Sequence, residues 1–166
     1  MTPTGTSHPS APWWRSRPPS DTPGGTLAEI DASDLVDLRR YVLRDGRVDL
    51  PATYPFDGEP SSLHLGVTAP DGAVVGGVTV VVDPLPGFAT LRLALMAVDP
   101  AVQGRGIGRC LVAAVQERAE EAGLDVWAAA RVGALGFYTG RGFVPRGDVY
   151  VGPMDLPHRR ILWRSG

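Results

Sequence analysis

The sequence is short of the residues that bind metals and form disulfides. It contains one cysteine, Cys110, and three histidines that lie far apart, His8, His64 and His158. A single cysteine cannot form an internal disulfide, and these residues lack the spacing of a zinc site. We therefore expect no structural metal, and a chain of 166 residues is long enough to fold on its hydrophobic core alone.

Lysine and asparagine are absent, so all 16 basic residues are arginine. The phosphate-binding P-loop needs a lysine after its glycines, which excludes that motif. The 18 acidic residues give a net charge of −2. Because a nucleic-acid-binding domain needs a basic face, we expect no nucleic-acid partner.

Long hydrophobic runs are also missing. No apolar run reaches the roughly 18 residues of a membrane-spanning helix, and residues 1–20 lack the basic start and apolar stretch of a secretory signal. We therefore expect a cytoplasmic protein with no membrane partner.

Glycine and proline, in contrast, are abundant, with 21 and 16 residues. Six of the prolines lie in residues 1–25, where no apolar period is visible. This composition predicts a flexible extension, with the Trp13-Trp14 pair packing transiently on the domain. Residues 26–166 are then expected to form a single domain.

From residue 26 on, strand and helix patterns alternate, which indicates an α/β or α+β fold with a mixed sheet. Strands are expected at residues 26–30, 63–68, 73–82, 89–98, 124–129 and from 143 to 163. Helices are expected after the caps at 31–34, at 106–122 and at 132–140. The proline-rich residues 47–61 are expected to form a loop beside a substrate.

The most informative segment follows the strand expected at 89–98. It reads Gln103-Gly-Arg-Gly-Ile-Gly108 and opens directly into a helix. Three glycines at this place allow successive backbone N–H groups to converge on an anion at the helix N-terminus. A ligand that carries phosphate is therefore expected. The G-x-G-x-G spacing of this loop differs from the G-x-G-x-x-G of dinucleotide-binding folds. A protein that binds a phosphosugar or a nucleotide through the same loop stays open as an alternative.

Residues 98–111 resemble the acetyl-CoA-binding motif of the GNAT superfamily of N-acetyltransferases, whose pattern is Q/R-x-x-G-x-G/A after a strand. A second segment, Ala134-Leu-Gly-Phe-Tyr138 followed by Arg141-Gly-Phe143, resembles the family's A-x-x-F-Y-x-x-x-G-F pattern. The likeness is strong over residues 93–143 and general over 27–163. The short segments Ser62-Leu-His-Leu-Gly66, Ala129-Ala-Arg131 and Pro157-His158 resemble a bacterial branch of the superfamily.

The resemblance implies a largely antiparallel mixed sheet of six to seven strands, splayed into a V near Ala97 and Val98 and flanked by about four helices. It also implies an enzyme that transfers an acetyl group directly from acetyl-CoA to a primary amine of a small molecule or protein, as a monomer or homodimer and without a metal. A non-catalytic CoA-binding sensor or interaction module is the alternative, because residues 90–98 contain no carboxylate that could act as a base.

The same resemblance suggests roles for individual residues. Tyr138 is expected to be the general acid, and His64 and His158 are the candidate bases because histidine titrates in the useful range. Asp57 and Glu59, in the proline-rich loop, are candidates for binding a cationic amine. The residues expected to contact the co-substrate are Ala97, Val98, Gln103, Gly104, Arg105, Gly106, Ile107, Gly108, Arg109, Arg131 and Phe137.

Overall fold

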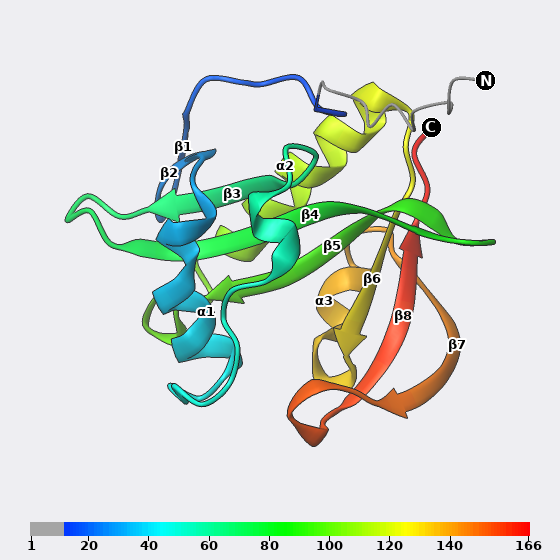
Figure 1. Ribbon diagram of the computed structural model, residues 1–166. Coiled ribbons are helices and arrows are strands. Elements are labelled where there is room, and N and C mark those ends of the chain that lie inside the picture. Colours follow the sequence, from blue (N-terminus) through cyan, green and yellow to red (C-terminus); the bar gives the residue numbers. More distant parts are fainter. Residues whose placement is uncertain (1–11) are drawn as a thin grey trace, which may run out of the picture.

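The computed structural model describes residues 12–166, which form an eight-stranded sheet in the order β1-β2-β3-β4-β5-β6-β8-β7 (Figure 1). The strands are β1 (Ser20–Thr22), β2 (Gly25–Glu29), β3 (Leu63–Thr68), β4 (Val74–Leu85), β5 (Ala89–Val98), β6 (Val126–Arg131), β7 (Val144–Val151) and β8 (Pro157–Trp163). The α-helices are α1 (Val36–Leu43), α2 (Ile107–Ala122) and α3 (Leu135–Thr139). Neighbouring strands are antiparallel except for β5 and β6, which are parallel.

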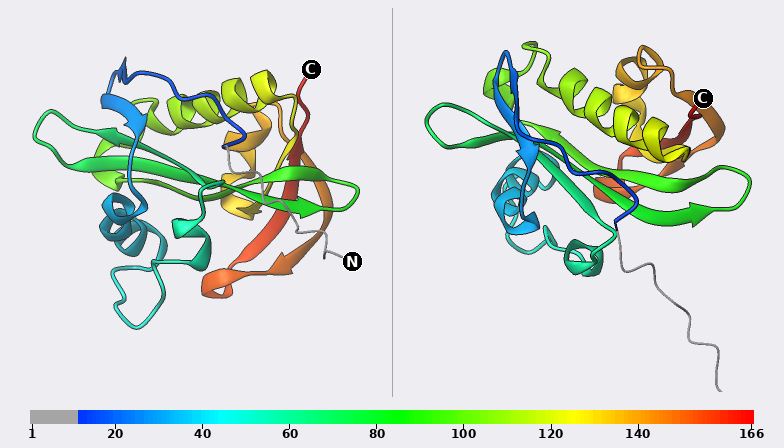
Figure 2. Two further views of the ribbon diagram at one scale, coloured as in Figure 1. Left: turned by 45° about the horizontal axis from the view of Figure 1, so that its top comes forward. Right: turned by 90° about the horizontal axis from the view of Figure 1, so that it is seen from above.

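Helices cover both faces of the sheet, with α2 and α3 on one side and α1 on the other (Figure 2). The glycines of β4 show how closely they pack. A methyl group on Gly76 would collide with Ile107 of α2, and one on the next residue, Gly77, would collide with Leu35 just before α1. Successive strand residues point to opposite faces, so these contacts define an α2 face and an α1 face.

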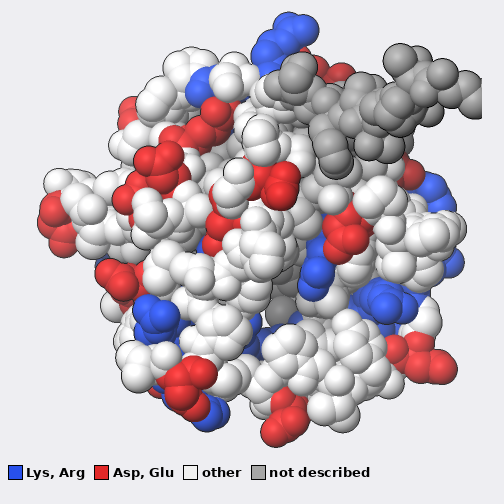
Figure 3. All heavy atoms as spheres, in the orientation of Figure 1, with Lys and Arg blue, Asp and Glu red and all other residues white. Residues whose placement is uncertain are grey.

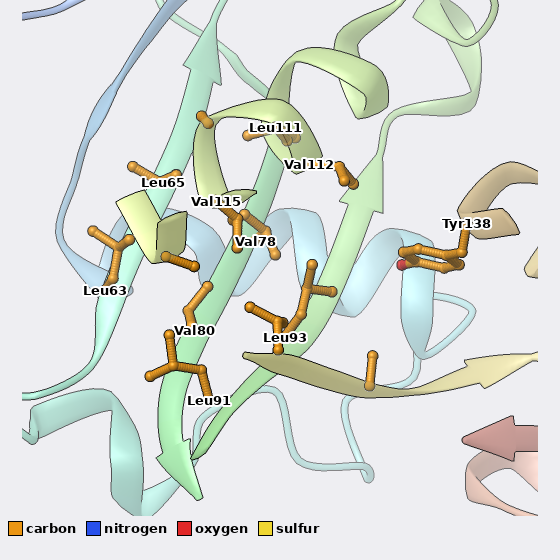
Figure 4. Packing of buried hydrophobic residues seen from close by; sticks show 14 of the residues in the cluster. Leu63, Leu65, Val78, Val80, Leu91, Leu93, Leu111, Val112, Val115 and Tyr138 are labelled. Carbon is orange, nitrogen blue, oxygen red and sulfur yellow. The ribbon is translucent and has the colours of Figure 1, made fainter. Parts of the chain in front are cut away.

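The main hydrophobic core lies between the sheet and α2 (Figure 4). Helix α2 contributes the buried residues Ile107, Leu111, Ala114 and Val115, whose spacing of i, i+4, i+7 and i+8 puts them on one face of the helix. The sheet contributes Leu63, Leu65, Val78, Val80, Leu91 and Leu93. Because the first residue of α2 is already buried, the glycine-rich loop that precedes the helix is held firmly against the end of β5.

Strands β5 and β6 separate soon after they meet. They pair only from Leu91 with Val126 to Leu93 with Ala128. Just beyond, Gly77 pairs with Ala97 but Thr79 pairs with Ala94, so β5 contains one extra residue, and Leu95 has a φ of 56°. A bulge of this kind bends a strand and ends its regular pairing. The V implied by the sequence is therefore present, but it opens after Leu93 and not near Ala97 and Val98.

Residues 12–25, which the sequence assigns to an extension, pack on the domain. The Trp13 indole N–H donates to the Ser61 carbonyl at 3.1 Å, and both tryptophans contact the core. Arg17 pairs with Glu117 at 2.8 Å and Glu121 at 2.9 Å on α2, and β1 adds a strand to β2. Residues 1–11 of the predicted extension lie outside the described residues.

The predicted class is confirmed, with small differences in the elements. The structure has eight strands and three α-helices where six to seven and about four were expected. Residues 143–163 form two strands, because a turn at η5 (Pro153–Asp155) reverses the chain between β7 and β8. Over residues 12–166, no helix has both the length and the apolar character needed to cross a membrane.

Candidate active site

The glycine-rich loop joins the end of β5 to α2. Asp99 caps the short turn η3 (Pro100–Val102) by accepting the Ala101 N–H at 2.9 Å. The Gln103 side-chain amide donates to the Val98 carbonyl at 3.3 Å and so ties the loop back to β5. Gly104 and Gly106 have φ values of 82° and 81°, which favour glycine over any other residue.

This geometry leaves a row of N–H groups without acceptors. Within the described part of the chain, none of the backbone N–H groups from Gly104 to Arg109 has a hydrogen-bond partner. The first N–H groups of a helix point outward at the positive end of its dipole, so the row can hold an anion. Arg105 and Arg109 are exposed beside it and make no ion pair with described residues, so both are free to add charge-assisted hydrogen bonds.

Residues of α3 close the other side of this site. Gly108 allows Phe137 to lie against α2, since an added Cβ would already be 3.3 Å from the Phe137 ring. Tyr138 is buried between Phe137 and Phe143, with ring centroids 5.1 and 5.6 Å away. Figure 4 shows the Tyr138 ring between the diverging strands β5 and β6, with its hydroxyl end directed toward β5.

The Tyr138 hydroxyl is suited to donate a proton. Burial raises the pKa of Tyr138 to about 12, so the group keeps its proton at neutral pH. Beyond Leu93, the edge of β5 that faces β6 pairs with no strand formed by residues 12–166. Backbone groups on that edge are therefore available to an extended ligand that carries amides.

His64 is part of a buried hydrogen-bond network on the α1 face. Arg39 donates to the Thr79 hydroxyl oxygen at 2.8 Å. That hydroxyl can donate to His64 Nδ1 at 2.8 Å, and His64 Nε2–H donates to the Asp57 carbonyl at 3.1 Å. Burial lowers the pKa of His64, which favours the neutral ring that this network requires. Both ring nitrogens are therefore occupied, and neither is free to take a proton from an amine.

Asp57 belongs to the same network and is not available to a substrate. Both of its carboxylate oxygens accept from Arg39, at 2.8 and 3.0 Å, and one also accepts the Tyr54 N–H at 2.9 Å. Burial alone would raise the pKa of Asp57, but these hydrogen bonds outweigh it and hold the pKa below its usual value. Glu59 is exposed, and its side chain makes no ion pair with described residues. The predicted site for a cationic amine is therefore not formed by Asp57.

His158 occupies a different place, on the α1 face of β8. It lies opposite Arg131 of β6 and Tyr150 of β7. Its Nδ1 is 2.7 Å from the Leu156 carbonyl, which can only accept, so Nδ1 carries the hydrogen and Nε2 has a free lone pair in the neutral ring. An added Cβ at Gly152 would lie 2.4 Å from Nδ1, so this glycine leaves just enough room for the ring.

The sequence-based prediction of site residues missed Arg39, which is 2 % exposed. A signal was present, because Arg39 lies four residues after Leu35, at a position where an amphipathic helix carries a core residue. It also placed Arg131 with the co-substrate contacts, whereas the structure puts Arg131 on the α1 face, where it donates to the Leu43 carbonyl at 3.3 Å. The described residues contain no group of three or more potential metal ligands.

The glycine-rich loop and the strands around it match a known protein family. The family model for the acetyltransferase (GNAT) domain matches residues 61–145, about half of the chain. This match covers β3 to the start of β7 and includes the loop and Tyr138. No curated protein matches the sequence significantly.

Solved structures share the whole fold at low sequence identity. An acyl-CoA N-acyltransferase from Pseudomonas aeruginosa superposes with a TM-score of 0.69 and 20% identity, over 82% of this chain and 97% of that one. ElaA from Escherichia coli gives 0.66 and 18%, over 83% and 98%. An aminoglycoside 6'-N-acetyltransferase complexed with coenzyme A gives 0.62 and 14%, over 83% and 96%.

Proposed function

Because the chain belongs to the GNAT family of acetyltransferases and is therefore an acyltransferase, we propose that it transfers an acetyl group from acetyl-CoA directly to a primary amine. The observation that carries this proposal is the row of unpaired N–H groups from Gly104 to Arg109 beside the open edge of β5. The loop suits a pyrophosphate, and the strand edge suits the amides of a pantetheine arm.

The residues of the loop and α3 fit acetyl-CoA, which supplies a thioester whose acetyl group an amine can attack. Gln103 holds the loop to Val98, and Gly104, Gly106 and Gly108 leave the N–H groups accessible. Arg105 and Arg109 are placed to add charge, and Phe137 packs on the start of α2. These contacts need no lysine and no metal.

Two proton transfers accompany the reaction. The amine nitrogen forms a bond to the carbonyl carbon, the carbon–sulfur bond breaks, the amine loses a proton and the thiolate gains one. We assign the second transfer to Tyr138, because its hydroxyl is protonated at neutral pH and lies where β5 and β6 diverge. Direct transfer needs no acyl-enzyme, so Cys110 has no role in it.

We assign acceptance of the amine proton to His158, not to His64. His158 has a free Nε2 and lies on the α1 face beside Arg131, whereas both nitrogens of His64 are bonded. The strand β5 offers no carboxylate for this purpose. The base accelerates the reaction by removing the proton of a charged amine. It therefore contributes to the rate only at a pH where most of the amine is protonated.

The loop assignment predicts that Gly106→Ala weakens binding of CoA about tenfold, because an alanine at a φ of 81° costs about 1–2 kcal/mol and the loop would relax away from its binding shape. Isothermal titration with CoA measures this. Gly133→Ala is the matched control, since its added Cβ meets nothing within 4 Å and its φ is not in the left-handed region. Unchanged CoA affinity in Gly106→Ala would contradict the assignment. Thiol release from acetyl-CoA with any amine would exclude a binding-only module.

Replacing His158 with glutamine is expected to lower kcat about tenfold near neutral pH, less than the roughly hundredfold usual for a general base, because solvent can also take the proton. The deficit should shrink as the pH rises, since more of the amine is then already neutral. Gly152→Ala should act in the same direction by displacing the ring. The measurement is kcat against pH together with the Kd for acetyl-CoA. A loss that is constant with pH would remove His158 from this role.

A further inference from the structure

Several arginines share the α1 face of the second half of the sheet. In the strand register, Ala129 of β6 lies opposite Arg160 of β8, and Arg160 lies opposite Arg146 of β7. One pleat further along β6, Arg131 lies opposite His158. Partners on adjacent strands project to the same side. Arg131 and Arg160 are diagonal neighbours, which places their Cα atoms about 7–8 Å apart, within reach of one small ligand.

These arginines have little charge compensation. Arg131 makes one hydrogen bond, to the Leu43 carbonyl, and neither it nor Arg160 forms an ion pair within residues 12–166. Arg160 instead lies over the Tyr150 ring at 5.8 Å. On β5, Arg92 reaches Asp83 only at 3.5 Å. Arg92 is therefore paired, whereas Arg131 and Arg160 have no counter-charge among the described residues.

The buried network of Arg39 and Asp57 adds no negative charge to this face. Asp57, which the sequence suggested as a ligand for a cationic amine, is neutralised by two hydrogen bonds from Arg39. Asp148 and Asp155, on β7 and in the turn that follows it, form no ion pair with the arginines among the described residues. None of these carboxylates therefore neutralises Arg131 or Arg160.

The region is also open enough for a ligand. Ala94, Ala97 and Ala129 point to the α1 face around the place where β5 and β6 separate. Figure 3, seen from this side, shows the surface hollowed between the two halves of the sheet, with basic atoms in and beside the hollow. The basic atoms in this view all belong to arginine side chains, since the chain has no lysine.

We propose that the acceptor is an amine that also carries an anionic group, a carboxylate or a phosphate, and that Arg131 and Arg160 bind this group. Two planar guanidinium groups at this spacing can bind both oxygens of such an anion, and the field of the face would attract it. The anion would then hold the amine close to His158, which stands opposite Arg131. The inference rests on the proposed function and reverses the charge preference that Asp57 and Glu59 suggest.

Matched pairs of acceptors test the proposal with the purified full chain. Phenylalanine is compared with phenethylamine, and O-phosphoethanolamine with ethanolamine, while spermidine serves as a polycationic acceptor. The readout is thiol release from acetyl-CoA. We expect kcat/KM to be at least about tenfold higher for the anionic member of one pair, and the pair that responds tells carboxylate from phosphate.

Charge-removing variants identify the residues. Arg131→Gln and Arg160→Gln should each raise KM for the preferred acceptor with a carboxylate or phosphate about tenfold to a hundredfold, and leave KM for the matched amine without that group unchanged. Arg159→Gln is the matched control, because Arg159 precedes Arg160 and points to the opposite face, where it bonds the Gly147 carbonyl at 2.9 Å.

Failure of the inference differs from failure of the proposed function. If phenethylamine, ethanolamine or spermidine is acetylated as well as the anionic acceptors, or if both arginine variants keep the wild-type KM, the anion site is refuted and the enzyme assignment stands. If the protein does not bind CoA and releases no thiol with any acceptor, the proposed function itself is refuted.

Discussion

Replacing Tyr138 with phenylalanine is expected to lower kcat about a hundredfold or more and to leave the Kd for acetyl-CoA nearly unchanged. The substitution removes only the hydroxyl, while the ring keeps its contacts with Phe137 and Phe143. A thiolate would then leave without a proton donor. Steady-state kinetics, together with calorimetric titration of acetyl-CoA, measures both quantities.

The matched control is Tyr41→Phe, because Tyr41 is 59 % exposed on α1 and has no assigned part in the reaction. The raised pKa of Tyr138, about 12, adds a second check, since the hydroxyl stays protonated through the usual assay range. The pH profile of the wild-type kcat should therefore show no decline from this residue below about pH 10. Equal losses in kcat and acetyl-CoA binding would make Tyr138 a binding residue and not the acid.

Replacing Asp57 with asparagine is expected to lower the free energy of unfolding by about 3–5 kcal/mol, because it leaves the buried Arg39 without its counter-charge. Arg39 is 2 % exposed and also bonds Thr79 and the Ala52 carbonyl, so it cannot move into water without breaking the network. Chemical denaturation measures the change. Arg39→Met combined with Asp57→Asn should recover much of it, because no charge is then left buried.

An exposed pair provides the comparison. Asp49→Asn breaks the Arg47–Asp49 ion pair, whose side chains are 53% and 62% exposed, and should cost less than about 1 kcal/mol. If Asp57→Asn costs no more than Asp49→Asn, the buried pair is not the anchor of α1 and η2 (Pro55–Gly58) that the structure indicates.

The pH dependence of the free energy of unfolding tests whether the charge of Asp57 contributes to stability. The pKa of Asp57 is lowered in the folded protein, so the stability from its ion pair is present above the unfolded value, about pH 4, and is lost as the pH falls through the folded value. Wild-type protein should therefore lose stability more steeply than Asp57→Asn below about pH 4. Parallel curves for the two proteins would show that the carboxylate contributes no charge-dependent stability.

Local features of this protein could be read from the sequence because they depend on neighbours along the chain. The β3 and β5 strands were predicted at residues 63–68 and 89–98, and the structure has them there. The loop after β5 needs glycines at left-handed positions and an apolar stripe at the start of the following helix, and both are visible in the letters of residues 103–115. The Phe137-Tyr138 pair could likewise be recognised from the sequence.

Other features depend on residues that are distant along the chain. Asp57 and Glu59 look alike in a proline-rich loop, but Asp57 meets Arg39, which no local pattern links to it. His64 and His158 both lie on strands, yet one has both nitrogens bonded and the other has one free. Residues 12–25 have the composition of a flexible segment, and only the partners Ser61, Glu117 and Glu121 explain why they pack.

By itself, the sequence determined the fold class, the family and the position of the glycine-rich loop, since each rests on short-range spacing of glycine, apolar and aromatic residues. The tertiary structure decided where the sheet opens, which polar groups are already paired and which charges remain uncompensated. Hydrogen bonds and ion pairs join segments brought together by the fold, and burial then sets whether each group is neutral, charged or free to react. Arg131, Arg146 and Arg160 come from three strands, and only the register of β6, β8 and β7 brings them together.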